Sequence, residues 1–246
     1  MRSYVIGDIH GQLDKLRAAH ARIAADRALT GDAAAPVIHL GDLVDRGPDS
    51  RGVIDLLIDG LDDGAPWVVV KGNHDRMLTG FLDDPDYHDP GLRGALHWFD
   101  PRLGGAETLA SYGVGGVGTR LITDIHAEAL ARVPAHHRAF LGGLALYHQR
   151  GEAVFVHAGI RPGIALPDQV EDDLVWIRAG FLDDSRDHGA LVVHGHTPVD
   201  RPVHYGNRLN TDTGAGYGRA LSAVVVEGRD AWLLTDTGRE AIIPVG

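Results

Sequence analysis

The sequence predicts an α/β protein built on two β-sheets that pack against each other. Up to about residue 82, short apolar runs alternate with amphipathic segments, which is typical of parallel strands covered by helices. After residue 144, short apolar runs follow one another with close turns, which indicates antiparallel strands and a second, mixed sheet. Polar residues that can bind metal ions follow five of the apolar runs, as expected where strand ends form a ligand crevice.

The alternating half of the chain contains three strand–helix pairs. Leu13, Leu16 and Ile23 recur at helical spacing after the first strand, and Asp49 or Ser50 is the expected cap of the second helix. In chain order we expect a strand at 3–6, a helix at 12–28, a strand at 37–40, a helix opened by 47–50, a strand at 67–71 and a helix at 76–82.

Regular patterning fails between residues 83 and 105. This stretch is rich in aspartate and contains three prolines and the aromatic residues Tyr87, Trp98 and Phe99. Long irregular segments in compact domains are usually functional or mobile. Two interpretations stand: an acidic, aromatic flap that contacts basic peptide beside a bound phosphate, or a solvated loop that packs Trp98 on the core.

The remaining elements complete one domain. Helical patterns resume at 107–111 and 125–141, and strands are expected at 153–156, 190–193, 220–226 and 231–234. Because donor residues near positions 8 and 196 must meet in one site, we expect residues 1–246 to form a single domain with an insert around 83–105.

Composition excludes several classes of protein. A formal net charge of −11 argues against a nucleic-acid partner, which requires a basic surface. The chain has no cysteine, so disulfides and thiolate metal sites are excluded. No run approaches the roughly 18 apolar residues of a membrane span, and no signal-peptide pattern precedes the first strand. We therefore expect a cytoplasmic protein with no membrane partner.

Six side chains with oxygen or nitrogen donors follow the apolar runs, close to glycine or alanine: Asp8, His10, Asp42, Asn73, His157 and His196. Alone, an aspartate after a strand is more often a turn or cap residue, and a single histidine among 15 is more often structural. The whole set favours a centre of two divalent cations. Its donors suit Mn²⁺, with iron or zinc as alternatives, and two such ions lower the pKa of bound water toward about 7.

The motifs that carry these residues are similar to those of the calcineurin-like metallophosphoesterases, especially small bacterial and phage serine/threonine phosphatases. The resemblance runs from residue 3 to about residue 226. In order, it includes Gly7-Asp8-Ile9-His10-Gly11, Gly41-Asp42-Leu43-Val44-Asp45-Arg46-Gly47, Gly72-Asn73-His74-Asp75, His157-Ala158-Gly159, Gly195-His196-Thr197-Pro198 and Asp212-Thr213-Gly214-Ala215. It implies a four-layer αββα sandwich with two mixed sheets and a dinuclear metal site at the strand ends.

The resemblance also implies residue roles. Asp8, His10 and Asp42 would hold one metal ion, with Asp42 bridging to a second ion held by Asn73, His157 and His196. Metal-activated water would then attack phosphorus directly and in line. His74 matches the residue that protonates the leaving oxygen, and Asp45 matches its orienting partner. Arg46 and Arg178 match the arginines that grip phosphate oxygens, although Arg178 could instead be a surface arginine beside Trp176.

Several features leave alternatives open. Asp75 stands where protein phosphatases usually carry Glu, and Lys71 replaces a common arginine. His194 could support the site from the core or join the first metal, and Asp212 more often holds a turn in such a place. The expected substrate is a phosphorylated protein or a small phosphoester. The rivals are a symmetrical dinucleoside tetraphosphate hydrolase and a silent phosphate-binding scaffold, which would be expected to lack a ligand or the Asp45–His74 pair.

Overall fold

The computed structural model describes residues 1–245, and within them no helix is long and apolar enough to cross a membrane. The helices are α1 (Leu13–Thr30), α2 (Ser50–Asp62), α3 (Asn73–Asp83), α4 (Gly105–Ser111), α5 (Ile122–Arg132), α6 (Ala135–Gly142) and α7 (Glu171–Trp176), with 3-10 turns η1 (Leu166–Asp168) and η2 (Ala215–Tyr217). The strands are β1 (Arg2–Ile6), β2 (Val37–His39), β3 (Trp67–Val69), β4 (Tyr147–Arg150), β5 (Ala153–Val156), β6 (Leu191–His194), β7 (Val203–His204), β8 (Arg208–Asn210), β9 (Ala223–Glu227), β10 (Asp230–Thr235) and β11 (Gly238–Ala241).

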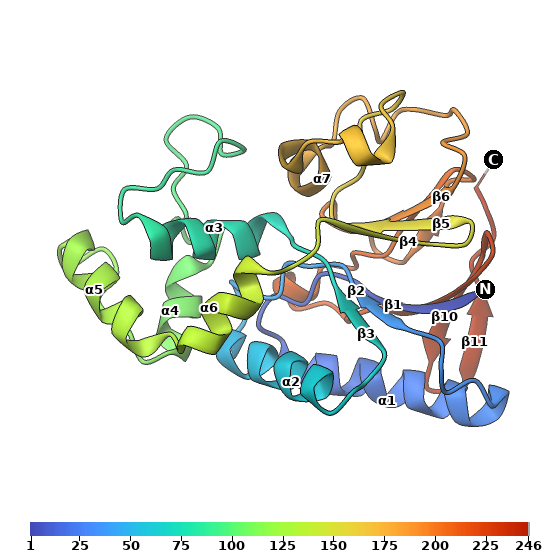
Figure 1. Cartoon of the computed structure of the whole chain (residues 1–246), viewed down its shortest axis with the longest axis horizontal. Coiled ribbons are helices and arrows are strands. Elements are labelled where there is room, and N and C mark those ends of the chain that lie inside the picture. Colours follow the sequence, from blue (N-terminus) through green and yellow to red (C-terminus); the bar gives the residue numbers. More distant parts are fainter. Residues whose placement is uncertain (246) are drawn as a thin grey trace.

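The strands form two mixed sheets, which confirms the predicted fold class (Figure 1). The first sheet has the order β11-β10-β9-β1-β2-β3, with β1, β2 and β3 parallel and β9, β10 and β11 antiparallel. The second has the order β4-β5-β6-β8-β7, with a parallel centre and antiparallel edges. The parallel start and antiparallel end of the chain are as expected.

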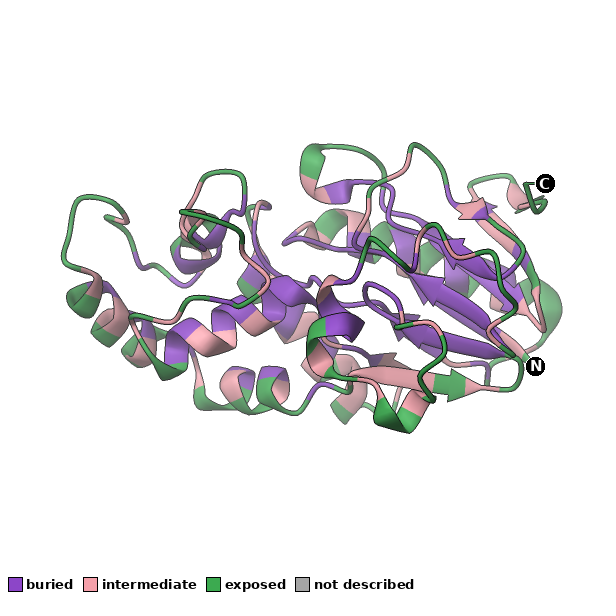
Figure 2. Cartoon of the chain, turned by 90° about the horizontal axis from the view of Figure 1, so that it is seen from above, coloured by how far each residue is buried: buried purple, intermediate pink, exposed green. Residues whose placement is uncertain are grey.

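Three apolar clusters separate the layers. Alternate residues of a strand face opposite sides of a sheet, and in β1 Tyr4 and Ile6 pack toward α1 and α2 while Val5 packs between the sheets. In β6, Val193 faces the other sheet and Val192 packs toward α7. Buried residues are concentrated in the central strands of the two sheets (Figure 2), and β5 and β6 are buried throughout. This arrangement is the four-layer αββα sandwich, with α1 and α2 below the first sheet and α7 above the second (Figure 1).

Most predicted helices occur where expected, with one correction. The side chain of Asp49 caps α2 by accepting a hydrogen bond from the Gly52 N–H at 2.8 Å. The helical pattern at 125–141 is two helices, because α5 ends at Arg132 and α6 starts at Ala135. Pro134 lies between them and disfavours helical backbone in the residue before it.

The irregular segment runs from residue 84 to 104, between α3 and α4. Trp98 is 3% exposed and packs in the core cluster below the first sheet, as one of the two interpretations expects. Asp89 is buried, with both oxygens accepting from Arg76 at 2.8 Å and one from Trp176 Nε1 at 2.9 Å. Asp89 therefore ties the segment to α3 by an ion pair and to α7 by a hydrogen bond.

Candidate metal centre

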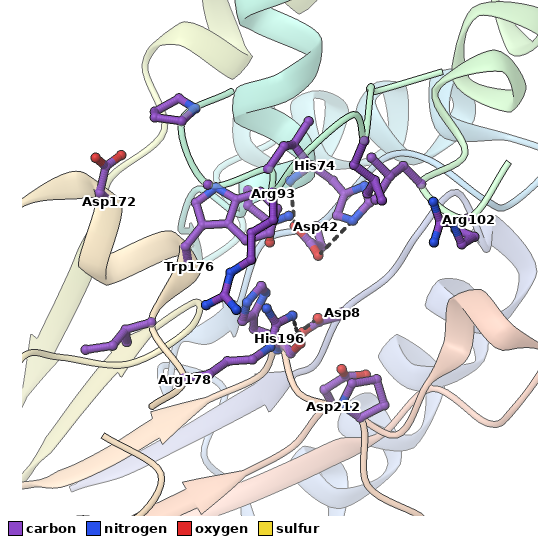
Figure 3. Close-up of a pocket in the computed structure, with 18 of the residues that line it drawn as sticks. Asp8, Asp42, His74, Arg93, Arg102, Asp172, Trp176, Arg178, His196 and Asp212 are labelled. Atoms are coloured by element: carbon purple, nitrogen blue, oxygen red, sulfur yellow. Dashed lines mark hydrogen bonds and ion pairs between the residues drawn. The ribbon is translucent and has the colours of Figure 1, made fainter. Parts of the chain in front are cut away.

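A cavity of about 720 Å³ opens where the loops after the central strands of both sheets meet (Figure 3). Asp8, His10, Asp42, Asn73 and His196 line it. His157 lies directly behind this wall, with its Nε2 3.0 Å from Asn73 Oδ1. The structure thus brings all six predicted ligand residues together from positions as far apart as 8 and 196.

The backbone around this cavity is locally strained. Among residues 1–245, the non-glycine residues with positive φ are His10, Asp42, Asp45, Arg46 and His196, with φ from 48° to 74°. This left-handed conformation costs of order 1–3 kcal/mol per residue and persists only where the surrounding structure imposes it. All of this strain lies in predicted site residues, so the loops hold these side chains in place at the expense of backbone energy.

Glycines permit the close approach of these loops. A Cβ atom at Gly72 would collide with Asp42, and one at Gly195 would collide with the carboxylate of Asp8. Only glycine leaves space for the ligand carboxylates at these two positions.

Asp42 lies between two groups of donors. Its Oδ2 is 3.4 Å from His10 Nε2 and 4.0 Å from His74 Nε2. Its Oδ1 is 3.4 Å from His157 Nε2. The donor atoms of His10, Asp42 and His74 lie within 4.8 Å of one another, and so do those of Asp42, His157 and His196. Asp42 belongs to both groups, so its carboxylate would be shared by the two ions that these groups could hold.

Main-chain carbonyls orient two of the imidazoles. The Nδ1 of His10 lies 2.9 Å from the Val44 oxygen, and the Nδ1 of His157 lies 2.8 Å from the Leu40 oxygen. A carbonyl oxygen only accepts hydrogen bonds, so each Nδ1 carries the ring proton. The lone pair of each Nε2 then points toward the Asp42 carboxylate, where a metal ion would bind. Burial lowers the pKa of both histidines, which keeps the rings neutral as metal ligation requires.

Several polar atoms here have lone pairs that no hydrogen-bond donor uses and that a metal ion would accept. His157 Nε2 faces acceptors, Asn73 Oδ1 at 3.0 Å and Asp42 Oδ1 at 3.4 Å, although its ring proton is on Nδ1. Within the described residues 1–245, Asp8 Oδ1 and His196 Nε2 are buried without a hydrogen-bond partner. Unsatisfied buried acceptors are costly. The donor set therefore fits divalent metal ions.

The carboxylates also repel one another. Burial, followed by the charges of Asp212 and Asp42, raises the pKa of Asp8 well above its usual value. Burial likewise raises the pKa of Asp212 to about 6. Positive charge placed between these groups would remove the repulsion, which is a second reason to assign cations to this site.

The predicted proton donor lies beside the metal ligands. His74 Nδ1 is 2.6 Å from Asp45 Oδ2, and its Nε2 accepts from Arg46 at 3.0 Å on the cavity side. Two residues that the sequence did not indicate complete the pair. Trp98 Nε1 donates to Asp45 Oδ2 at 2.8 Å, and Thr108 Oγ1 donates to Asp45 Oδ1 at 2.6 Å.

Five arginines line the cavity, alongside five aspartates. Both predicted arginines line it: Arg46 contacts the Nε2 of His10, and Arg178 donates to the His196 carbonyl at 3.4 Å. The structure adds three more that were not predicted, Arg93, Arg102 and Arg161. In the part of the chain that the structure describes, Arg102 and Arg161 pair with aspartates, whereas Arg93 and Arg178 have no ion pair and point into the cavity (Figure 3).

The acidic flap is one of the two interpretations of this segment, and the residues that line the cavity do not have the charge that it requires. The part of residues 84–104 that lines the cavity contains no acidic residue and consists of Pro90, Gly91, Leu92, Arg93, Leu96, Arg102 and Leu103. Its acidic residues serve other partners, as the burial of Asp89 against Arg76 and Trp176 shows. A count of charges along a segment does not reveal which of them face a cavity.

The residues of uncertain role are placed as follows. Asp75 accepts from the Leu43 and Gly72 N–H groups, both at 2.9 Å, and so joins two of the ligand loops. Asp212 accepts from the Gly214 N–H at 2.8 Å, which holds a turn as expected.

His194 Nε2 accepts from Arg208 at 3.2 Å, so this histidine is a core residue outside both donor groups. Lys71 pairs with Glu171 at 3.3 Å.

One further group of potential ligands lies apart from the cavity, on α2 and α6. His137 Nε2 donates to Asp55 at 2.8 Å and its Nδ1 accepts from the Tyr112 hydroxyl at 2.9 Å, with His136 alongside. Both ring nitrogens of His137 thus have hydrogen-bond partners, so this histidine joins α6 to α2 and to the end of α4.

Known proteins share this chain's motifs and fold. The family model described as calcineurin-like phosphoesterase matches residues 1–221. The bis(5'-nucleosyl)-tetraphosphatase PrpE [asymmetrical] of Geobacillus thermodenitrificans is 27% identical and covers 89% of this chain and 88% of its own. Serine/threonine-protein phosphatase 1 of Salmonella typhimurium is 27% identical over 91% of each chain. The cold-active protein-tyrosine phosphatase of a psychrophilic Shewanella shares the fold, with a TM-score of 0.64 at 16% identity over 98% of this chain and 80% of its own.

Proposed function

We propose that this chain, which belongs to the calcineurin-like phosphoesterase family, is a metal-dependent phosphomonoesterase of the serine/threonine protein phosphatase type. One observation carries the proposal: the Asp45–His74 pair, at 2.6 Å, faces the same cavity as the donors gathered around Asp42. A proton donor, a cation site and unpaired arginines in one cavity are the components that phosphate ester hydrolysis requires.

The metal ligands are proposed in two sets that share Asp42. Asp8, His10 and Asp42 would hold one ion, and Asn73, His157 and His196 would hold the other with Asp42. Asp8 is in neither of the two observed donor groups, so its assignment depends on the family resemblance and on its place in the cavity wall. Manganese is the proposed metal, with iron and zinc as alternatives, because all donors are oxygen or imidazole nitrogen. When bound, the two ions supply positive charge beside the phosphate and lower the pKa of a bound water.

The remaining steps are assigned to side chains of the cavity. Arg46 and Arg178 bind the phosphate oxygens, a task for which the planar guanidinium is suited. Arg46 must first leave His10 and His74, whose Nε2 atoms it contacts here. With Arg46 gone, Nε2 of His74 takes up a proton from solvent and passes it to the departing alkoxide, while Asp45 holds the Nδ1 side of the ring.

The proposal is tested with p-nitrophenyl phosphate in the presence of Mn²⁺. Wild-type protein is expected to release p-nitrophenol, and Asp42→Asn is expected to reduce this turnover sharply. His74→Asn is expected to reduce turnover sharply on phenyl phosphate, whose leaving group requires a proton. His136→Asn, on the surface of α6, is the matched control and is expected to keep wild-type turnover. Full activity in both site variants would reject the assigned roles, and an inactive wild type under every divalent metal would favour the silent scaffold.

A second candidate is hydrolysis of a dinucleoside tetraphosphate. The specific observations that favour it are the relatives named as asymmetrical tetraphosphatases and the additional arginines along a cavity of about 720 Å³. The relatives differ in this respect from the symmetrical enzymes considered from the sequence. Turnover of diadenosine tetraphosphate and of a phosphoserine peptide, measured side by side, separates the candidates, and the products distinguish asymmetrical from symmetrical cleavage.

A further inference from the structure

The carboxylate of Asp45 is held from behind by two neutral donors. It is 0% exposed, and Thr108 Oγ1 donates to its Oδ1 at 2.6 Å while Trp98 Nε1 donates to its Oδ2 at 2.8 Å. The Oδ2 atom also faces His74 Nδ1 at 2.6 Å. Each carboxylate oxygen therefore has a fixed donor in addition to the histidine.

The backbone of Asp45 is fixed by the same neighbours. Its N–H donates to Thr108 Oγ1 at 2.8 Å and to Ser50 Oγ at 3.2 Å. The residue has φ of 74°, a left-handed conformation that needs such support. Thr108 thus holds Asp45 at two points, by accepting from its main chain and donating to its side chain.

Trp98 is itself immobilised by packing. Its ring lies 5.1 Å from Phe81 and 4.8 Å from Phe99, centroid to centroid, and it is 3% exposed. Gly105 lies so close that a Cβ atom there would collide with the indole. The direction of the indole N–H is therefore set by the core and not by Asp45, which makes it a rigid support for the carboxylate.

We propose that Trp98 and Thr108 are positioning residues for the Asp45–His74 pair, so that the segment 84–104 and the adjoining α4 complete the proton-donating part of the site. This inference rests on the proposed phosphatase function. A carboxylate fixed at both oxygens keeps the imidazole ring in one plane, with Nδ1 toward Asp45 and Nε2 toward the leaving oxygen. With one support removed, the carboxylate can rotate, and the ring loses that orientation.

The variants to compare are Trp98→Phe, which removes the indole N–H, and Thr108→Val, which removes the hydroxyl and keeps the shape. Trp176→Phe is the matched control. Its indole N–H also donates to a buried carboxylate beside the cavity, Asp89, which keeps Arg76 as its partner. Thermal unfolding establishes that each variant is folded, and Thr108→Val keeps the test decisive should Trp98→Phe not fold.

The decisive readout is dependence on the leaving group. p-Nitrophenolate departs with little help, whereas phenolate, like the tyrosine side chain with a pKa near 10, benefits from a proton. We expect Trp98→Phe and Thr108→Val to lower kcat roughly tenfold or more for phenyl phosphate, within the ~10²–10⁴-fold contribution of general acid catalysis. The loss for p-nitrophenyl phosphate should be much smaller, with KM little changed, and Thr108→Ser should recover activity. In Trp176→Phe the ratio of the two rates should stay at the wild-type value.

Equal losses on both substrates, or an unchanged kcat for phenyl phosphate, would overturn the inference while leaving the proposed function intact. An inactive wild-type protein would instead reject the proposed function, and the inference with it. A readout without turnover is the ¹⁵N-indole resonance of Trp98, one of four tryptophans. Asp45→Asn should shift this resonance and leave that of Trp176 in place, and a stationary Trp98 signal would contradict the hydrogen bond on which the inference depends.

Discussion

The ligand loops and the segment 84–104 both line the cavity, but they are built differently. The loops that carry Asp8, Asp42 and His196 are short, follow strands directly and contain the positive-φ backbone. The segment has no regular structure and is held by distant contacts, through Asp89 to Arg76 and through Trp98 to the core. Strand ends thus fix the positions of the proposed metal ligands, whereas the segment supplies supporting hydrogen bonds and arginines.

This difference predicts that substitution of a proposed ligand in the loops lowers kcat more than any substitution in the segment. Asp42→Asn, which weakens the shared ligand while keeping its shape, is expected to lower kcat with Mn²⁺ by roughly 10³-fold, the upper range for loss of one electrostatic stabiliser. The measurement is steady-state turnover of p-nitrophenyl phosphate together with metal content of the purified variant. Arg93→Ala, in the segment, provides the comparison. An equal loss in both variants would remove the distinction between the two regions.

A second prediction concerns the pair that both regions build. His74→Asn is expected to reduce kcat by about 10²–10⁴-fold for phenyl phosphate, because the proton donor is absent. The reduction should exceed that of Trp98→Phe, since the latter disturbs only the support. Rates for both variants on the same substrate give the order, and a greater loss in Trp98→Phe would mean that the segment does more than position Asp45.

The loop after β8, which carries Asp212 beside Asp8, should change the stability of the metal-free protein with pH, unlike the segment. The pKa of Asp212 is raised to about 6 by burial, so ionisation of this group destabilises the metal-free fold as pH rises from about 4 through 6. Asp212→Asn is therefore expected to stabilise metal-free protein at pH 7.5 by roughly 1–3 kcal/mol and to have no such effect near pH 4. Chemical unfolding of wild type and Asp212→Asn at both pH values measures the difference in their free energies of unfolding. Saturating Mn²⁺ should abolish the gain, because cations already offset the carboxylate charge; a gain that is the same at every pH would contradict the electrostatic explanation.

The smallest effect is expected at the cavity mouth. Arg93 is exposed and has no ion pair within residues 1–245. Exposed ion pairs contribute ~0.2–1 kcal/mol. Arg93→Ala should therefore raise KM for a substrate with a second anionic group by less than about fivefold and leave kcat nearly unchanged. Parallel KM measurements on p-nitrophenyl phosphate and on a nucleoside diphosphate test it. A loss confined to kcat would place Arg93 in the chemistry instead.

The same contrast explains what the sequence can predict. Asp8, Asp42 and Asn73 each follow an apolar run and a glycine, a local pattern that can be recognised from the sequence alone. The roles of His74 and Asp45 came from resemblance to a family and not from spacing. The break at Pro134, which separates α5 from α6, was readable in principle from the restriction that proline imposes on the preceding residue.

Other features depend on contacts between distant residues. Trp98 and Thr108 are 53 and 63 residues from Asp45 along the chain, and no local pattern distinguishes them from other core residues. Arg93 lies in a segment whose composition suggested an acidic surface, and only the fold shows that it faces the cavity. The short strands β7 and β8 have two and three residues, too few for a strand period to emerge.

The central claim is that donors from both sheets bind two cations around Asp42. The direct test is anomalous X-ray scattering from crystals grown with Mn²⁺. Two peaks are expected, one on each side of the Asp42 carboxylate and about 3.5–4 Å apart, the separation found in known two-metal sites. No peak at Asp42, or ions bound only at the Asp55, His136 and His137 group, would contradict the account.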